Sequence, residues 1–138
     1  MPKTSPPPTY PLMEHAADLQ AGSGRAMSDI TLEAAAAGEL SSDDLKIKAA
    51  TLQAQAQIAR NSGYTQLAGN LSRAAELTAV PNQELLQMYE QLRPRRATYD
   101  ELIALAEKLE QTYQAPETAR FIREAASAYQ TRDLLRRN

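Results

Sequence analysis

Two consecutive amphipathic helices are predicted for residues 98–130, which read TYDELIALAEKLEQTYQAPETARFIREAASAYQ. Thr98 and Glu101 have the spacing of a capping box, in which each side chain accepts a hydrogen bond from the backbone amide of the other residue. The first helix is expected to continue from this cap to about Gln114. Pro116 then begins the second helix, which is expected to continue to the C-terminus, because proline is well tolerated in the first helical turn. The large apolar residues of both segments recur at intervals of three and four, which is the helical period.

Similar signals recur through the preceding seventy residues. Asp29 or Thr31 can cap a short helix that Gly38 ends, and Ser41 and Asp44 lie at a second cap. Further helices are expected over residues 34–37, 48–61, 64–79 and 82–92, with Asn82 as the N-cap of the last. Short loops between them favour antiparallel neighbours. The sequence therefore predicts an all-α fold, a small helical domain of about five helices.

Residues 1–28 are expected to form an extended, irregular arm. Four prolines between Pro6 and Pro11 fix φ and remove amide donors, which favours polyproline II structure or disorder. One short amphipathic helix can form around Leu12–Leu19. A disordered tail is one interpretation; an arm that packs on a partner subunit is the other, because the segment holds many apolar side chains. The predicted domains are accordingly the arm, 1–28, and the helical domain, 29–138.

The apolar composition predicts a core with few large side chains. The chain has 25 Ala and 17 Leu, but only one Val, one Phe and no Trp. Alanine lets helices approach closely, yet it removes little apolar area from water, at about 25 cal/mol per Å². A small domain with such a core is marginally stable by itself. We therefore expect much of the large apolar surface to face a partner.

The sequence contains no recognisable catalytic or metal-binding set. There is no Cys, and His15 is the one histidine, which we interpret as a surface or interface residue. The carboxylate pairs Asp43-Asp44 and Asp100-Glu101 lie at predicted helix starts, where they oppose the positive end of the helix dipole. No catalytic, cofactor-binding or metal-binding residue is assigned to this chain.

Charge is segregated along the chain. Residues 29–44 contain five acidic and no basic residues, whereas basic residues concentrate at Arg93–Arg96 and Arg136-Arg137. Complementarity with a protein partner is one interpretation of this pattern, and a solvated face is the other. A net charge of −2 argues against nucleic acid as a partner, and the absence of a long apolar run argues against a membrane span.

Short sequence motifs spread over nearly the whole chain resemble those of the small (gamma) subunit of the adenosylcobalamin-dependent diol and glycerol dehydratases. None is diagnostic alone; their order and spacing carry the resemblance. They are Tyr10-Pro-Leu12, Asp29-Ile-Thr-Leu-Glu33, Gly38-Glu39, Thr51-Leu52, Gln55-Ala-Gln-Ile-Ala59, Arg73-Ala-Ala-Glu-Leu77, Pro81, Tyr89, Leu92-Arg-Pro94, Glu101-Leu102, Phe121-Ile-Arg-Glu-Ala125 and Tyr129-Gln130. Residues 13–25 depart from the family pattern, so contacts of that loop are not carried over.

The resemblance implies a non-catalytic subunit of an enzyme that converts propane-1,2-diol or glycerol to an aldehyde and water by a radical route. It implies that adenosylcobalamin is bound by the other subunits, not by this chain. The implied partners are a large and a medium subunit, assembled as a dimer of three-chain units. The implied location is the cytoplasm, either free or inside a bacterial microcompartment.

Ten residues are predicted to lie at subunit contacts. They are Tyr10, Leu12, Asp29, Ile30, Leu32, Arg73, Tyr89, Arg93, Phe121 and Tyr129. The alternative from a different class is a stand-alone helical adaptor or regulatory protein. A small self-contained enzyme and a nucleic-acid binder are further alternatives, and the residue set favours neither.

Overall fold

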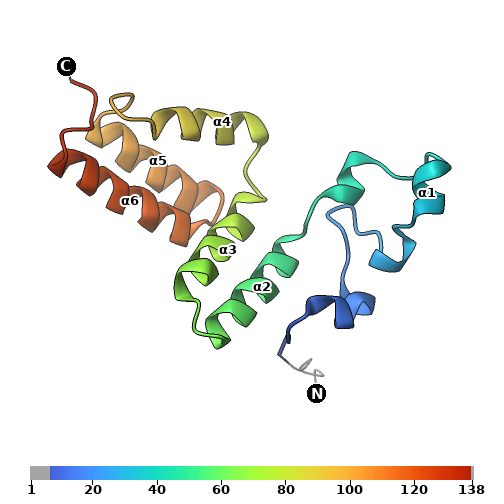
Figure 1. Ribbon diagram of the computed structural model, residues 1–138. Helices are drawn as coiled ribbons and strands as arrows, with labels where there is room; N and C mark the ends of the chain where they lie inside the picture. Colours follow the sequence, from blue (N-terminus) through green and yellow to red (C-terminus); the bar gives the residue numbers. More distant parts are fainter. Residues whose placement is uncertain (1–6, 138) are drawn as a thin grey trace. The chain divides into compact units, whose positions relative to one another are not determined.

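The computed structural model describes residues 7–137, so residues 1–6 of the predicted arm and Asn138 lie outside the described residues (Figure 1). Within residues 7–137 the regular structure is helical, with two isolated β-bridges and no strand. The helices are α1 (Leu32–Ala36), α2 (Ala49–Asn61), α3 (Thr65–Leu77), α4 (Asn82–Gln91), α5 (Tyr99–Thr112) and α6 (Pro116–Thr131), with 3₁₀ helices at Leu12–Asp18, Met27–Asp29 and Ser42–Leu45. The prediction of an all-α fold is confirmed.

Contacts between residues divide the chain into two compact units, the N-terminal unit (Met1–Ala75) and the C-terminal unit (Glu76–Asn138). Each unit is described by itself below. The predicted boundary between arm and helical domain, after residue 28, falls inside the N-terminal unit and stays a prediction.

The C-terminal unit is built on α5 and α6, which pack along each other (Figure 1). The predicted capping box begins α5. The Thr98 amide donates to the Glu101 carboxylate at 3.0 Å, and the Glu101 amide donates to the Thr98 hydroxyl at 3.2 Å. Pro116 is the first residue of α6, as expected.

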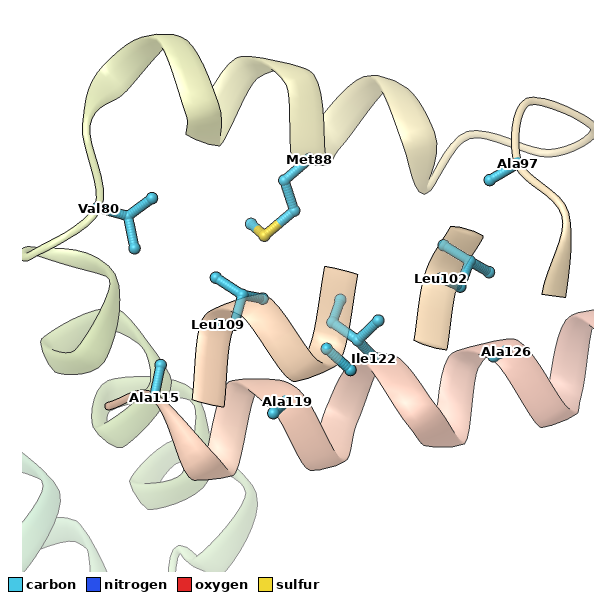
Figure 2. Close-up of a cluster of buried hydrophobic side chains, with 10 residues drawn as sticks. Val80, Met88, Ala97, Leu102, Leu109, Ala115, Ala119, Ile122 and Ala126 are labelled. Carbon is cyan, nitrogen blue, oxygen red and sulfur yellow. The ribbon is translucent and has the colours of Figure 1, made fainter. Parts of the chain in front are cut away.

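The core of the C-terminal unit lies between α4, α5 and α6 (Figure 2). Leu102 and Ile122 are its largest fully buried side chains, and Met88 reaches toward them from α4. Much of the remaining core is alanine, such as Ala106 and Ala119, both 0% exposed. Small side chains at these positions allow the backbones of α5 and α6 to approach closely. Each large residue in this core therefore supplies a larger share of the buried apolar area.

A carboxylate far away in sequence caps α6. Glu76, in the last turn of α3, accepts hydrogen bonds from the amides of Glu117 (2.9 Å) and Thr118 (2.7 Å) and from the Thr118 hydroxyl (2.6 Å). These amides belong to the first turn of α6 and have no partner within the helix. Sequence reasoning missed this cap, because it joins residues 41 and 42 positions apart.

The N-terminal unit contains α1, α2 and most of α3. The side chain of Thr31 caps α1 by accepting from the Ala34 amide at 3.1 Å, and Gly38 follows the helix with φ +73°, both as predicted. Gly63 ends α2 with φ +85°, in the left-handed region where glycine avoids the steric penalty of a Cβ. Leu52 is the one large apolar residue among the buried residues of α2 and α3.

One cap, one helix end and one helix type differ from the prediction. Pro81, not Asn82, is the N-cap of α4, and no side chain caps that helix. The last helix ends at Thr131 instead of continuing to the C-terminus, because Asp133 adopts a left-handed φ of +56° and turns the tail back. The short helix expected around Leu12–Leu19 is a 3₁₀ helix without buried residues.

The C-terminal core predicts a large cost for removing its main side chain. Leu102→Ala leaves a cavity between helices that alanines already hold close, and it should lower the free energy of unfolding by about 2–5 kcal/mol. Urea unfolding followed by circular dichroism measures the change. Leu86→Ala is the control, since Leu86 is 69% exposed on α4 and its removal should cost less than about 0.5 kcal/mol. Equal costs for the two variants would contradict this account of the core.

Candidate subunit interface

The N-terminal unit contains an apolar groove of about 1090 Å³. Its walls come from the N-terminal segment, the 3₁₀ helix Ser42–Leu45 with the residues that follow it, and helices α2 and α3. The large apolar side chains that line it are Tyr10, Leu12, Met13, Leu19, Met27, Ile30, Leu45, Ile47, Ile58, Tyr64, Leu67 and Leu71. Among the described residues, the charged side chains that line it are Asp44 and Lys46.

Many of these side chains are exposed. Among the described residues ten large apolar side chains are exposed, and six of them line the apolar groove: Tyr10, Met13, Leu45, Ile47, Tyr64 and Leu67. Tyr10 and Leu45 are exposed by 82% and 78%. A contiguous apolar surface of this kind is typical of a protein interface, whereas single exposed apolar residues need no explanation.

A buried carboxylate holds the N-terminal segment against the wall of the groove. Asp44, 5% exposed, accepts hydrogen bonds from the Ser23 hydroxyl (2.5 Å) and the Ser41 amide (2.8 Å) and pairs with the Arg25 guanidinium (3.2 Å). The hydrogen bond from Ser23, followed by that from Ser41, lowers the pKa of Asp44 to about 2. The contact with Ser41 completes the predicted cap, and the contacts with Ser23 and Arg25 fix a segment about twenty residues away.

Gly22 lies at the closest approach between these two segments. Its amide donates to the Lys46 carbonyl at 2.6 Å, and a Cβ at position 22 would lie 2.9 Å from the Lys46 Cβ. The absence of a side chain therefore allows the N-terminal segment to lie directly against residues 43–47.

The structure brings three of the ten predicted interface residues into the apolar groove: Tyr10, Leu12 and Ile30. Asp29 is exposed beside them, and Leu32 is 82% exposed on α1 but does not line the groove. Arg73 donates to Asn70 within α3.

The other four predicted residues lie in the C-terminal unit. Tyr89 and Phe121 are exposed, by 56% and 45%. Arg93 pairs with Glu90 at 3.1 Å, and the Tyr129 hydroxyl donates to the Leu92 carbonyl at 2.6 Å, which is a contact inside the unit. Whether any of the ten contacts a partner stays a prediction.

Sequence reasoning missed much of the groove's far wall. Leu67 and Leu71 of α3 both line the groove, and Leu67 is 50% exposed. Tyr64, Leu67 and Leu71 are spaced by three and four residues, so the helical period marked one face correctly. The sequence could not tell whether that face meets the same chain or another one.

A smaller hollow of about 300 Å³ lies beside α4 and α5 and is lined by both polar and apolar side chains. Glu84 and Lys108 form an ion pair across it at 3.0 Å. A hydrogen bond with Tyr113, followed by that with Lys108, lowers the pKa of Glu84, and the contact with Glu84 raises the pKa of Tyr113. These groups satisfy each other within the unit, so we assign them a structural role.

The polar residues considered for chemistry are dispersed. His15 is exposed, and its Nε2 lies 2.8 Å from the Thr9 hydroxyl oxygen. In the described part of the chain, no three His, Asp or Glu side chains are grouped so that they could hold a metal ion. None of the helices between residues 7 and 137 has the length and apolar character needed to span a membrane.

The described residues thus form an all-α chain with an exposed apolar groove. Residues 7–136 match the family described as dehydratase small subunit. Two relatives are the propanediol dehydratase small subunits of Citrobacter freundii and Salmonella typhimurium, 43% and 42% identical over 128 residues. Both alignments cover 92% of this chain and 74% of the relative. The chain belongs to the dehydratase small subunit family, as the resemblance of its sequence predicted.

The Asp44 network predicts a specific pH dependence. Because the folded-state pKa of Asp44 is lowered, its contribution to stability is fully present above the ordinary aspartate pKa and is lost as the pH falls toward 2. Asp44→Asn should therefore lower the melting temperature at pH 6, and the deficit should shrink between pH 4 and pH 2. Thermal melts across this range measure it. Asp43→Asn is the matched control, because Asp43 is exposed and pairs only with Lys46; a deficit for Asp44→Asn that stays constant with pH would refute the assignment.

Proposed function

We propose that this chain is the non-catalytic small subunit of a cobalamin-dependent hydro-lyase that converts propane-1,2-diol or glycerol to the aldehyde and water. In this proposal it binds the large subunit, supports assembly with a medium subunit, and forms part of a dimer of three-chain units. The reaction takes place in the other chains, and the complex is in the cytoplasm, either free or inside a microcompartment.

The observation that carries the proposal is the apolar groove in a member of the dehydratase small subunit family. A subunit needs a surface that only its partner covers, and the groove collects most of the exposed large apolar side chains of the described residues. Eleven of the 17 buried apolar residues are alanine, so the interior supplies little of the apolar area that stabilises a free domain. Both facts favour a chain that is stable mainly in complex.

The sequence offers one imidazole that could ligate the cobalt of a cobalamin. The single imidazole of the sequence, His15, is exposed in a 3₁₀ helix near the N-terminus and bonded to Thr9. We therefore propose that adenosylcobalamin, which supplies the radical chemistry of the complex, is held by the other subunits.

Assembly through the groove predicts that a charge placed in it blocks binding. Leu45→Asp should leave the free chain folded, because the side chain is 78% exposed. In the complex the carboxylate would be buried without a partner, which should weaken binding to co-expressed large and medium subunits roughly 100-fold or more. Co-purification through a tag on the small subunit, followed by titration of the purified parts, measures the loss.

Leu86→Asp is the matched control, since it changes a leucine on α4 that is 69% exposed and does not line the groove. If Leu45→Asp and Leu86→Asp bind alike, the groove is not the docking surface. Leu32→Asp tests the predicted contact of α1 in the same assay, and unchanged binding would remove Leu32 from the interface.

The proposal also predicts that dehydratase activity belongs to the three-chain complex and not to the isolated small subunit. The purified chain with adenosylcobalamin and propane-1,2-diol should form no aldehyde, and the co-expressed three-chain complex should form it. Turnover by the isolated chain would contradict a non-catalytic role. A stable monomer that fails to bind the large and medium subunits would favour the alternative of a stand-alone adaptor.

A further inference from the structure

Two basic segments far apart in sequence meet at one end of the C-terminal unit. The Arg95 amide donates to the Leu134 carbonyl at 2.7 Å, and the Arg136 amide donates to the Ala97 carbonyl at 2.8 Å. The C-terminal tail therefore lies beside the loop between α4 and α5 (Figure 1). This contact collects six of the chain's 15 basic residues into what we call the arginine end: Arg93, Arg95, Arg96, Arg132, Arg136 and Arg137.

Backbone and side-chain contacts hold the arginine end in place. The Tyr129 hydroxyl ties α6 to the Leu92 carbonyl at the start of the loop, and the Leu134 amide donates to the Tyr129 carbonyl at 2.8 Å. Arg95 and Asp133 have left-handed φ values of +65° and +56°. This conformation carries a steric cost for a residue such as arginine, so the contacts around Arg95 hold it in place. The arginines are thus presented by a defined backbone.

The charges at the arginine end do not cancel. Glu90 pairs with both Arg93 and Arg96, at 3.1 and 3.5 Å, and Glu101 pairs with Arg136 at 2.8 Å. Asp133 pairs with Arg137. Three carboxylates thus form ion pairs with four arginines. Within residues 7–137, no ion pair within 4 Å is formed by Arg95 or Arg132, although the hydrogen bond and charge of Arg137, and then the charge of Arg95, lower the pKa of Asp133. The excess of positive charge belongs to a chain whose net charge is −2, so it is a local feature.

We propose that the arginine end binds a carboxylate-rich surface of a partner subunit, as a second contact beside the apolar groove. This inference rests on the proposed function, because it takes the partner to be another chain of the dehydratase. The planar guanidinium forms paired hydrogen bonds with a carboxylate, which gives such a contact orientation as well as attraction. Phosphate would also attract arginine, but the three interspersed carboxylates would repel a nucleic-acid backbone and fit a surface of mixed charge.

The test uses the double variant Arg95→Glu with Arg132→Glu in the full-length chain. Its affinity for the co-expressed large and medium subunits should fall roughly tenfold or more at low salt. The wild-type affinity should weaken as salt rises from about 50 to about 500 mM, and that of the variant should depend less on salt, because the attraction is screened. Circular dichroism establishes that the variant is folded, and Arg95→Gln with Arg132→Gln provides a milder change with a smaller loss if the reversal unfolds the chain.

The matched control is Arg60→Glu with Arg120→Glu, which changes the net charge equally at exposed arginines elsewhere. Equal affinity and equal salt dependence for the control and the Arg95/Arg132 variants would overturn the proposal. Salt-sensitive binding of a 30-base-pair DNA duplex by the wild type, lost in the Arg95/Arg132 variant, would also overturn it in favour of nucleic acid. Failure of the wild-type chain to bind the other subunits would instead contradict the proposed function.

Discussion

The scarcity of large buried side chains is the constraint on which the rest of the structure depends. Alanine occupies most buried apolar positions, so helices approach closely while little apolar area leaves water. In the C-terminal unit a few residues, chiefly Leu102 and Ile122, supply the core. In the N-terminal unit the large apolar residues line a groove instead. The two units therefore use apolar residues differently, one to stabilise itself and the other to offer a surface.

Polar contacts do much of the long-range positioning in such a chain. Glu76 caps α6, and Asp44 holds the segment that contains Ser23 and Arg25. Each carboxylate satisfies amides or hydroxyls that would otherwise lack partners, so these contacts specify an arrangement that the small alanine side chains alone would not select. The fold thus combines close helix packing with a small number of directional contacts.

The sequence predicted the local structure well and the distant contacts poorly. Capping residues and the helical period located α2, α3, α5 and the start of α6 within one or two residues, because the physical signals for these features are adjacent in the chain. The contacts of Glu76 with Thr118 and of Arg95 with Leu134 join segments about forty residues apart, and no local pattern encodes them. The family could be predicted from the order of short sequence motifs along the chain. The apolar groove could be identified only from the structure.

The place of Gly22 beside Lys46 has a consequence for variation in this protein. A methyl group there would overlap a neighbouring side-chain carbon, so alanine requires the two segments to separate by a fraction of an ångström. That displacement would move the wall of the groove that residues 44–47 form. A surface loop usually tolerates exchange freely; at position 22 one extra carbon would instead change the shape of the groove's wall.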